Sequence, residues 1–432
     1  MEYIIASCSD AEVIEKIKNV VEKDFKEDFL LQFPPTEKSI IERLNFELPE
    51  LVLINFSDPI LDPVFLKDQI LSDSWLHNFG IIGIYDRKKD KEEEILNKYK
   101  EINLLTLIDY SSIESHLGKS LEIISSNRQL IFQGFLTDKL VSRVTGSFQI
   151  NNLDYLVAPV YGGLIAISLV RMGKISPDDR YSLQMALSEL ILNSIEHGNC
   201  GISYSEKTDW IANGRSIYEL IIQRCADPEI SGRKVILEWD VDDERCRFSI
   251  TDDGNGFDVV KFREKLKEDS NDRLHGRGIM MAQMVADKLL YSKKGNQVVI
   301  IINLEKQVEN EAPLGFRGEE VINVKPGDIL MKAGEFGDCI YYISSGKFTV
   351  YHNEVAVGRI TPADIFMGEM AFLLNNARSA TVIADSQGKV IKIPRKSFIE
   401  VVKNYPQYSI FLAKLLAQKL VRSNEKTFVE QQ

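Results

Sequence analysis

Residues 186–199 read ALSELILNSIEHGN, and the rest of the chain can be understood outward from this stretch. At 3.6 residues per turn, Leu187, Leu190, Ile191 and Ile195 share one side of a helix, while Glu189, Asn193 and Glu196 share another. Glu189 and Asn193 are four residues apart, so their side chains lie one above the other. An asparagine oxygen can anchor a magnesium ion whose other ligands are water and phosphate, and a neighbouring carboxylate can take a proton from a hydroxyl. We expect Gly198 to end the helix.

A second stretch, TDDGNGFD at residues 251–258, follows an alternating strand predicted over residues 245–250. Asp252 therefore stands where the strand ends. Gly254 and Gly256 permit backbone angles and a close ligand approach that other residues resist. By itself, an Asp-Asp-Gly sequence most often marks an ordinary turn.

A third stretch, HGRGIMMAQMVADKLL at residues 275–290, places Gly276 and Gly278 at the start of a predicted helix. Free N–H groups and the helix dipole favour phosphate at such a position. The chain contains no G-x-x-x-x-G-K-[ST] motif, which excludes a Walker-type nucleotide site. Each of the three stretches is common alone, and their order and spacing together predict a nucleotide pocket.

The three stretches together resemble the GHKL ATP-binding domain shared by gyrase, MutL and histidine kinases, and within it they look most like the anti-sigma-factor serine kinases. The resemblance implies a Bergerat α/β sandwich over residues 146–306, with ATP and Mg²⁺ as cofactors. It implies that Glu189 is the catalytic base, that Asn193 coordinates magnesium, and that Asp252 accepts a hydrogen bond from the adenine amino group. The residues that it assigns to the lid and phosphate site are Gly254, Gly256, Gly276, Arg277 and Gly278.

The sequence around these stretches predicts their scaffold. Ser176 before a proline is a strong helix start. Residues 156–173 are predicted to form a buried helix, and hairpins are predicted across residues 242–244 and 295–296. Residues 201–232 form an insertion whose role the sequence does not reveal. Strands joined by hairpins with helices between them predict a largely antiparallel sheet covered by helices.

Residues 1–125 alternate short apolar runs with helical patterns, which predicts a parallel sheet covered on both faces. The pattern resembles the flavodoxin-like receiver domain of response regulators. Asn55 stands where a receiver carries its phosphoacceptor aspartate, and Asp109 and Tyr110 stand where Lys-Pro is expected. We therefore predict a pseudo-receiver that docks or dimerises, in which Asp10 and Asp58 are turn residues rather than substitute acceptors. A helical linker is expected over 126–145.

Residues 315–432 change to short strands with turns, which predicts a small antiparallel roll followed by a terminal helix. The segment MGEMAFLLNNARSATVIA within it resembles the cyclic nucleotide-binding domain. Gly368 permits a tight backbone, Glu369 can accept a ribose hydroxyl, and Arg378 can meet a cyclic phosphate. The further candidate contacts are Met370, Ala371 and Ser379. The sequence does not decide between cAMP and cGMP.

Composition narrows the class of protein. The 432 residues carry 52 basic and 64 acidic side chains, a net charge of −12, which argues against a general nucleic-acid-binding surface. Five cysteines are scattered without a C-x-x-C pair, so neither a disulfide framework nor a zinc site is indicated. The longest uncharged run, residues 155–170, is short for a membrane span, and the N-terminus has no signal-peptide organisation. We expect a cytoplasmic protein.

These interpretations converge on multidomain α/β and α+β architecture and on signal transduction. We expect a cyclic nucleotide to regulate an ATP-dependent serine/threonine protein kinase whose substrate is an anti-sigma-factor antagonist, with a homodimer possible and no membrane or nucleic-acid partner. One alternative is an unorthodox histidine kinase, although neither His77 nor His116 has the acidic neighbour usual for an acceptor. The other is a binding switch that holds ATP and cyclic nucleotide without phosphoryl transfer.

Overall fold

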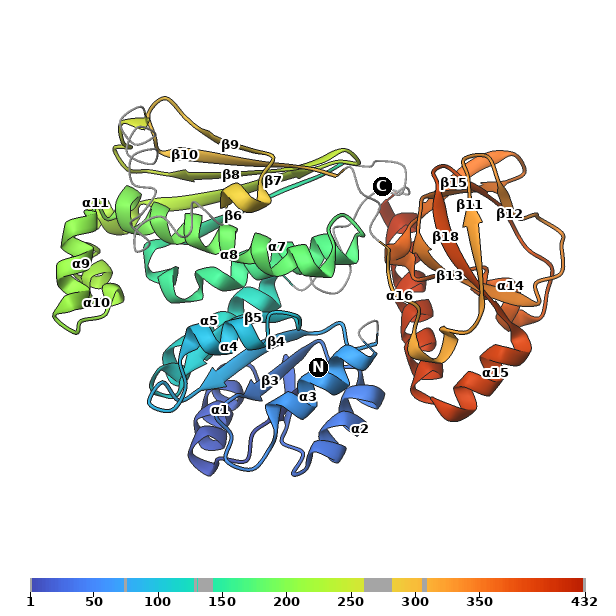
Figure 1. Ribbon diagram of the computed structural model, residues 1–432, viewed down its shortest axis with the longest axis horizontal. Coiled ribbons are helices and arrows are strands. Elements are labelled where there is room, and N and C mark those ends of the chain that lie inside the picture. Colours follow the sequence, from blue (N-terminus) through green and yellow to red (C-terminus); the bar gives the residue numbers. More distant parts are fainter. Residues whose placement is uncertain are drawn as a thin grey trace. The chain divides into compact units, whose positions relative to one another are not determined.

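The computed structural model (Figure 1) describes residues 2–73, 76–127, 130, 143–259, 282–304 and 309–429. The chain forms two compact units. The first combines Met1–Ser111 with Glu309–Gln432, and the second is Ser112–Val308.

The N-terminal part of the first unit is a five-stranded parallel sheet in the order β2-β1-β3-β4-β5. Its strands are β1 (Glu2–Ser7), β2 (Phe29–Gln32), β3 (Leu51–Asn55), β4 (Gly80–Tyr85) and β5 (Leu104–Asp109). Its helices are α1 (Ala11–Asp24), α2 (Glu37–Glu47), α3 (Pro63–Ser72) and α4 (Glu92–Lys98). Strands β3 and β4 are buried along their whole length, as expected for parallel strands covered on both faces. The edge strand β2 and helix α2 were not predicted.

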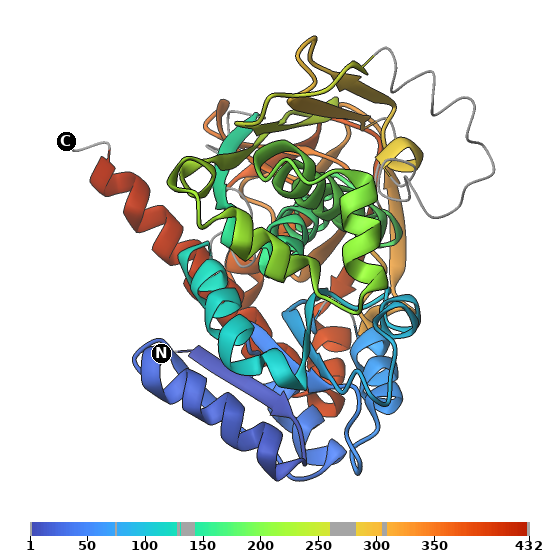
Figure 2. The same cartoon turned by 90° about the vertical axis from the view of Figure 1, so that its left-hand side faces the viewer.

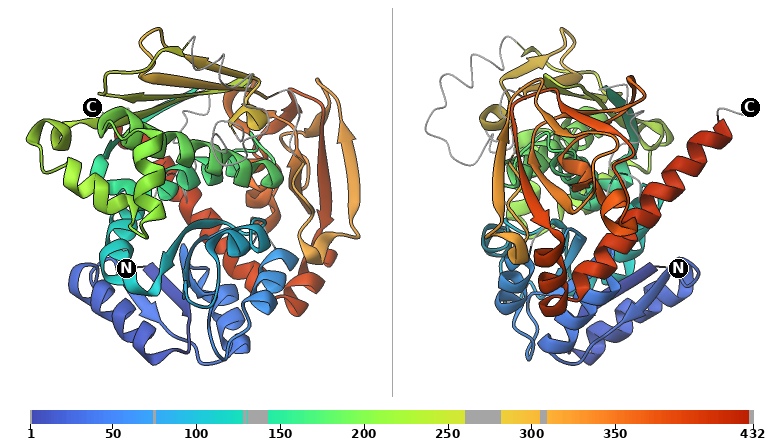
Figure 3. Two further views of the ribbon diagram at one scale, coloured as in Figure 1. Left: turned by 60° about the vertical axis from the view of Figure 1, so that its left-hand side comes forward. Right: turned by 90° about the vertical axis from the view of Figure 1, so that its right-hand side faces the viewer.

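The C-terminal part of the first unit is a roll of two four-stranded sheets, in the orders β11-β18-β13-β16 and β12-β17-β14-β15 (Figure 3). Their strands are β11 (Glu320–Val324), β12 (Ile329–Met331), β13 (Cys339–Ser345), β14 (Phe348–His352), β15 (Val355–Ile360), β16 (Phe366–Met367), β17 (Thr381–Ala384) and β18 (Gly388–Pro394). The helices are α14 (Glu369–Leu374), α15 (Arg395–Asn404) and α16 (Gln407–Val429). All the pairings are antiparallel, which confirms the predicted roll. Helix α16 is the predicted terminal helix.

The second unit stacks an antiparallel sheet, in the order β6-β7-β8-β10-β9, on a layer of helices (Figure 1). Its strands are β6 (Val144–Asn151), β7 (Lys234–Val241), β8 (Arg245–Asp252), β9 (Lys288–Tyr291) and β10 (Gln297–Asn303), and its longer helices are α5 (Ile113–Ser126), α7 (Ala158–Arg171) and α8 (Pro177–Asn193). The hairpins β7–β8 and β9–β10 form where the sequence predicts them. Ser176 caps α8 as predicted, because its hydroxyl accepts the N–H of Asp179 at 3.1 Å.

Among the described helices of this unit for which the composition can be compared, α7 is the most apolar. The helical stretch Asn152–Arg171 has a mean hydropathy of 1.7 and is long enough to cross a membrane, but 72% of it is buried inside the fold. A core helix of a globular domain has this composition, and the predicted buried helix is confirmed. Residues 201–232 fold into the helices α9 (Tyr204–Ala212), α10 (Ile217–Arg224) and α11 (Pro228–Gly232), seen in Figure 2.

Candidate functional site

Glu189 and Asn193 occupy the last turn of α8, and both side chains are half-buried. We expected the helix to end at Gly198, but it does not. Instead, residues Ser194–Asn199 continue as a π-helical turn, and Gly201 is the residue that adopts a positive φ of 62°. Single π-turns occur often at functional sites, and this one follows directly after the candidate magnesium anchor.

Gly198 is needed for a different reason, which is its closeness to the strand end at Asp252. A Cβ atom at Gly198 would collide with the Asp252 carboxylate, and one at Gly254 would collide with the carbonyl of Gly198. Only glycine permits such an approach. The first two sequence stretches are therefore brought into contact, with the Asp252 carboxylate against the helix end.

Asn199 fastens this contact and was not among the predicted site residues. It is fully buried; its Oδ1 accepts the N–H of Asp253 at 2.9 Å, and its Nδ2 donates to Oδ1 of Asn152 at 2.8 Å. Arg233 donates to its carbonyl oxygen at 2.8 Å. Asn199 is the last residue of the motif ALSELILNSIEHGN, and this position is the sequence signal that could have identified it.

The Asp252 carboxylate is buried, with 7% of the residue exposed. Burial raises its pKa to about 6, against a partial lowering by the N–H of Gly254, which donates to Oδ1 at 2.9 Å. Asn296 holds the main chain of Asp252 on both sides, by bonds of 3.0 and 2.9 Å. A fixed, poorly solvated carboxylate is suited to accept hydrogen bonds from a ligand amino group.

The phosphate half of the predicted pocket lies outside the described residues, because Gly276, Arg277 and Gly278 fall within 260–281. Among the described residues, no group of three or more His, Cys, Asp or Glu side chains could hold a metal ion. Magnesium bound with a nucleotide usually keeps phosphate and water among its ligands, so a magnesium anchor at Asn193 does not require such a group.

The second candidate site lies in the roll, around Arg378. Its guanidinium group is buried, with 7% of the residue exposed, and it donates to the carbonyls of Gly368 at 2.7 Å and Cys339 at 2.6 Å. Among the residues that the structure describes, no carboxylate pairs with Arg378. Gly368 has a φ of 80°, and a Cβ there would collide with the guanidinium. The site thus holds a buried positive charge that a bound anion could balance.

The other residues predicted for this site differ in their partners and in their exposure. Glu369 begins α14 and pairs with Lys419 of α16 at 2.7 Å. Ala371 is buried against Gly337, whereas Met370 and Ser379 are exposed. The carboxylate that could accept a ribose hydroxyl therefore already has an ionic partner.

In the N-terminal sheet, the hydrogen bonds around Asn55 form a closed network. Its Oδ1 accepts the Tyr110 hydroxyl at 3.0 Å and the N–H of Ser57 at 3.1 Å. Asp58 accepts from Ser9 and from the main chain at Leu61; although burial opposes it, these hydrogen bonds lower the pKa of Asp58. Asp10 caps α1. Both aspartates thus have the local structural roles that the sequence predicts.

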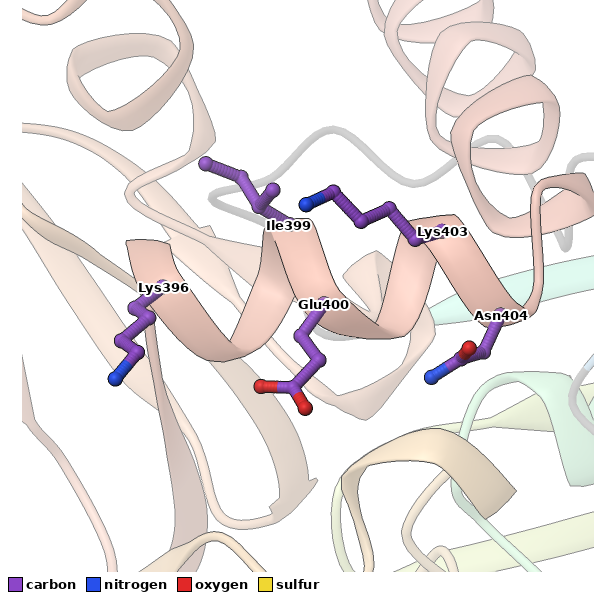
Figure 4. A pocket seen from close by; sticks show the side chains of 5 residues that line it. All are labelled: Lys396, Ile399, Glu400, Lys403 and Asn404. Carbon is purple, nitrogen blue, oxygen red and sulfur yellow. The ribbon is translucent and has the colours of Figure 1, made fainter.

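A groove also runs along α15, lined by Lys396, Ile399, Glu400, Lys403 and Asn404 (Figure 4). Glu400 and Asn404 point to one side of the helix, and Ile399 and Lys403 to the other. The side chains do not converge on one point, and none belongs to either candidate site.

Two family profiles match parts of the chain. The profile for a histidine kinase-like ATPase domain matches residues 221–302, and the profile for a cyclic nucleotide-binding domain matches residues 321–405. The first match includes Asp252 but not Glu189 or Asn193. The second includes Glu369 and Arg378 and ends before α16. The chain therefore combines a kinase-like ATPase domain with a cyclic nucleotide-binding domain.

Each of the similar proteins described below matches only part of this chain, and this chain covers only 10% of the kinase among them. A cGMP-dependent protein kinase of Plasmodium berghei (strain Anka) is 38% identical over 82 residues, which are 19% of this chain and 10% of that kinase. A catabolite activator protein of Thermus thermophilus is 21% identical, with a TM-score of 0.26 over 27% of this chain and 57% of its own. A cyclic nucleotide-binding-like protein of Brucella abortus is 30% identical, with a TM-score of 0.19 over 20% of this chain and 77% of its own.

The raised pKa of Asp252 predicts a characteristic effect of Asp252→Asn on stability. Since the folded-state pKa of about 6 lies above the ordinary 3.8, the ionised carboxylate destabilises the fold above pH 6. At pH 7.5 the amide variant should therefore be more stable, by up to about 3 kcal/mol. Its advantage should shrink as the pH falls through 6 and vanish below 4. Urea unfolding followed by intrinsic fluorescence measures this, with the exposed Asp209→Asn as control. Equal stability of wild type and variant at pH 7.5 would contradict the assignment.

Proposed function

We propose that this protein is a cyclic-nucleotide-regulated, ATP-dependent protein kinase of signal transduction. The observation that supports the proposal is the close approach of Gly198, in the π-helical turn Ser194–Asn199, to Asp252 at the end of β8. Glu189 and Asn193 lie in α8, which leads directly into that turn. This proximity of the two segments supports the proposed roles of Glu189 as proton acceptor, Asn193 as metal anchor and Asp252 as adenine acceptor. The kinase-like ATPase profile over residues 221–302 supports the same reading.

In the proposed reaction, Asp252 binds the adenine amino group and orients the nucleotide. Magnesium, when bound at Asn193, neutralises charge on the phosphates. Glu189 accepts the proton of a substrate hydroxyl. The oxygen of that hydroxyl forms a bond to the γ-phosphorus, while the bond between the γ-phosphorus and the ADP oxygen breaks. The products are a phosphorylated side chain and ADP. Positioning supplies most of the rate, because little covalent chemistry is asked of the protein.

We propose serine or threonine of an anti-sigma-factor antagonist as the substrate, on the resemblance of the helical motif to the anti-sigma-factor serine kinases. Glu189 on the helix favours a hydroxyl acceptor, because its carboxylate can remove the hydroxyl proton. The N-terminal domain takes no part in phosphoryl transfer in this proposal. Its strand order is that of flavodoxin-like sheets, and the amide at Asn55 supports a pseudo-receiver.

Cyclic nucleotide binding is assigned to the roll. Arg378 would balance the cyclic phosphate, and Glu369 would accept the ribose hydroxyl. The buried guanidinium without a carboxylate partner among the described residues, together with the matching family profile, supports this assignment. Either cAMP or cGMP satisfies these contacts.

Replacing the proposed base should separate catalysis from binding. Glu189→Gln should retain Mg-ATP but lower phosphoryl transfer at least about 100-fold, because a general base contributes that much or more. Asn193→Ala should weaken the magnesium-dependent part of ATP binding. Transfer of γ-labelled phosphate to candidate partner proteins measures the first effect, and equilibrium binding of ATP with and without magnesium measures the second.

The exposed Glu238→Gln, on β7, is the matched control for Glu189→Gln. An acid-stable product identifies phosphoserine or phosphothreonine, whereas an acid-labile product would indicate a histidine kinase. Transfer that persists unchanged in Glu189→Gln would exclude the proposed base. Mg-ATP binding with no transfer to any partner would favour the binding switch.

Removing the guanidinium of Arg378 should weaken cyclic nucleotide binding tens of times to a hundredfold, since a hydrogen-bonded buried charge pair contributes about 2–3 kcal/mol. Calorimetric titration with cAMP and cGMP compares wild type, Arg378→Ala and the exposed Arg359→Ala, with thermal unfolding to confirm that the roll is folded. Unchanged affinity in a folded Arg378→Ala protein would refute the site.

A further inference from the structure

The ammonium group of Lys419 contacts the carboxylate that the proposed cyclic nucleotide site uses. Its Nζ lies 2.7 Å from Oε1 of Glu369 and 3.3 Å from the carbonyl oxygen of Phe366. The Glu369 side chain is 12% exposed and that of Lys419 is 30% exposed, so water screens the pair only in part. A ribose hydroxyl that donates to Glu369 has to compete with Lys419 for the same oxygens.

The helix that carries Lys419 is anchored elsewhere along its length by the N-terminal domain. The hydroxyl of Tyr408 donates to Oδ2 of Asp73 at 2.9 Å, and both residues are buried. Lys414 donates to the carbonyl oxygen of Leu48 at 2.8 Å. Tyr408, Lys414 and Lys419 all belong to α16, so one continuous helix joins the N-terminal domain to the proposed ligand carboxylate.

Apolar packing strengthens this contact. Leu48 and Leu76 from the N-terminal domain belong to the same buried cluster as Phe316, Tyr408 and Leu412. Leu48 ends α2 with a φ of 47°, a left-handed conformation that glycine usually adopts at a helix end. Leucine is disfavoured there, and its side chain, 6% exposed, is buried in the cluster. The contact between the domain and α16 therefore offsets a conformational cost.

We propose that the N-terminal domain is an intramolecular antagonist of cyclic nucleotide binding that acts through α16. By holding residues 408–414, it keeps Lys419 on Glu369. The inference rests on the proposed cyclic nucleotide site and adds its regulation. Coupling is reciprocal: if the docked domain weakens ligand binding, bound ligand weakens docking by the same factor. The N-terminal domain thus has a regulatory role that requires no phosphorylation of Asn55.

The coupling is tested in the full chain with two variants that loosen opposite ends of the connection. Lys419→Met removes the ammonium and keeps the apolar stem. Tyr408→Phe removes only the hydroxyl, which donates to Asp73 and also accepts the N–H of Gly315 at 3.3 Å. Each should tighten the binding of cAMP or cGMP about fivefold in calorimetry, as expected for the loss of one competing contact. Matched controls are Lys403→Met on α15 and Tyr405→Phe, whose ring stacks on Tyr408 outside the Asp73 contact.

Amide hydrogen exchange in the N-terminal domain supplies a second measurement of the same coupling. Saturating nucleotide should accelerate amide exchange at the end of α2, residues 44–48, in wild type. Wild-type affinity in both variants, or weaker binding in Lys419→Met, would overturn the antagonism while leaving the binding site intact. Tighter binding in Lys419→Met alone would overturn the role of the N-terminal domain. Failure of every protein to bind either nucleotide would instead refute the proposed function.

Discussion

The steric contact between Gly198 and Asp252 is the constraint on which the candidate ATP site depends. The end of a helix and the end of a strand can approach this closely only because neither Gly198 nor Gly254 carries a side chain. Asn199 and Asn296 then fix the backbone on either side by hydrogen bonds. A methyl group at either glycine would push the strand end away from the helical turn, and Asp252 would no longer lie against the motif that contains Glu189 and Asn193.

Both candidate sites keep a charged group in a poorly solvated position. Asp252 is a buried carboxylate that accepts one main-chain N–H, and Arg378 is a buried guanidinium that donates to main-chain carbonyls. Burying a charge costs stability unless a partner compensates it. An amino group at Asp252 or a phosphate at Arg378 would supply that compensation. Ligand binding would therefore offset the free-energy cost of burying each charge in the free protein. Such positions are typical of ligand sites.

Sequence reasoning recovered the features that follow from local rules. The Ser176 cap, the two hairpins, the buried α7 and the antiparallel roll each depend on neighbouring residues, and each is found as predicted. It missed what depends on contacts between distant segments. Gly198 was taken for a helix stop because glycine usually ends helices, whereas its role is set by Asp252, 54 residues away by their numbering. The partner of Glu369 was missed for the same reason, since Lys419 reaches it from a separate helix.

Helix α16 explains why the first unit contains both ends of the chain. The family profile for the cyclic nucleotide-binding domain ends at residue 405, and α16 starts at Gln407. Beyond the matched range, α16 makes three polar contacts. The Tyr408 hydroxyl donates to Asp73, the Lys414 ammonium donates to the carbonyl oxygen of Leu48, and the Lys419 ammonium contacts Glu369. A rigid helix transmits a displacement at one contact to the others. In the proposed coupling, a ligand that draws Glu369 away from Lys419 acts on the same helix that the N-terminal domain holds through Tyr408 and Lys414.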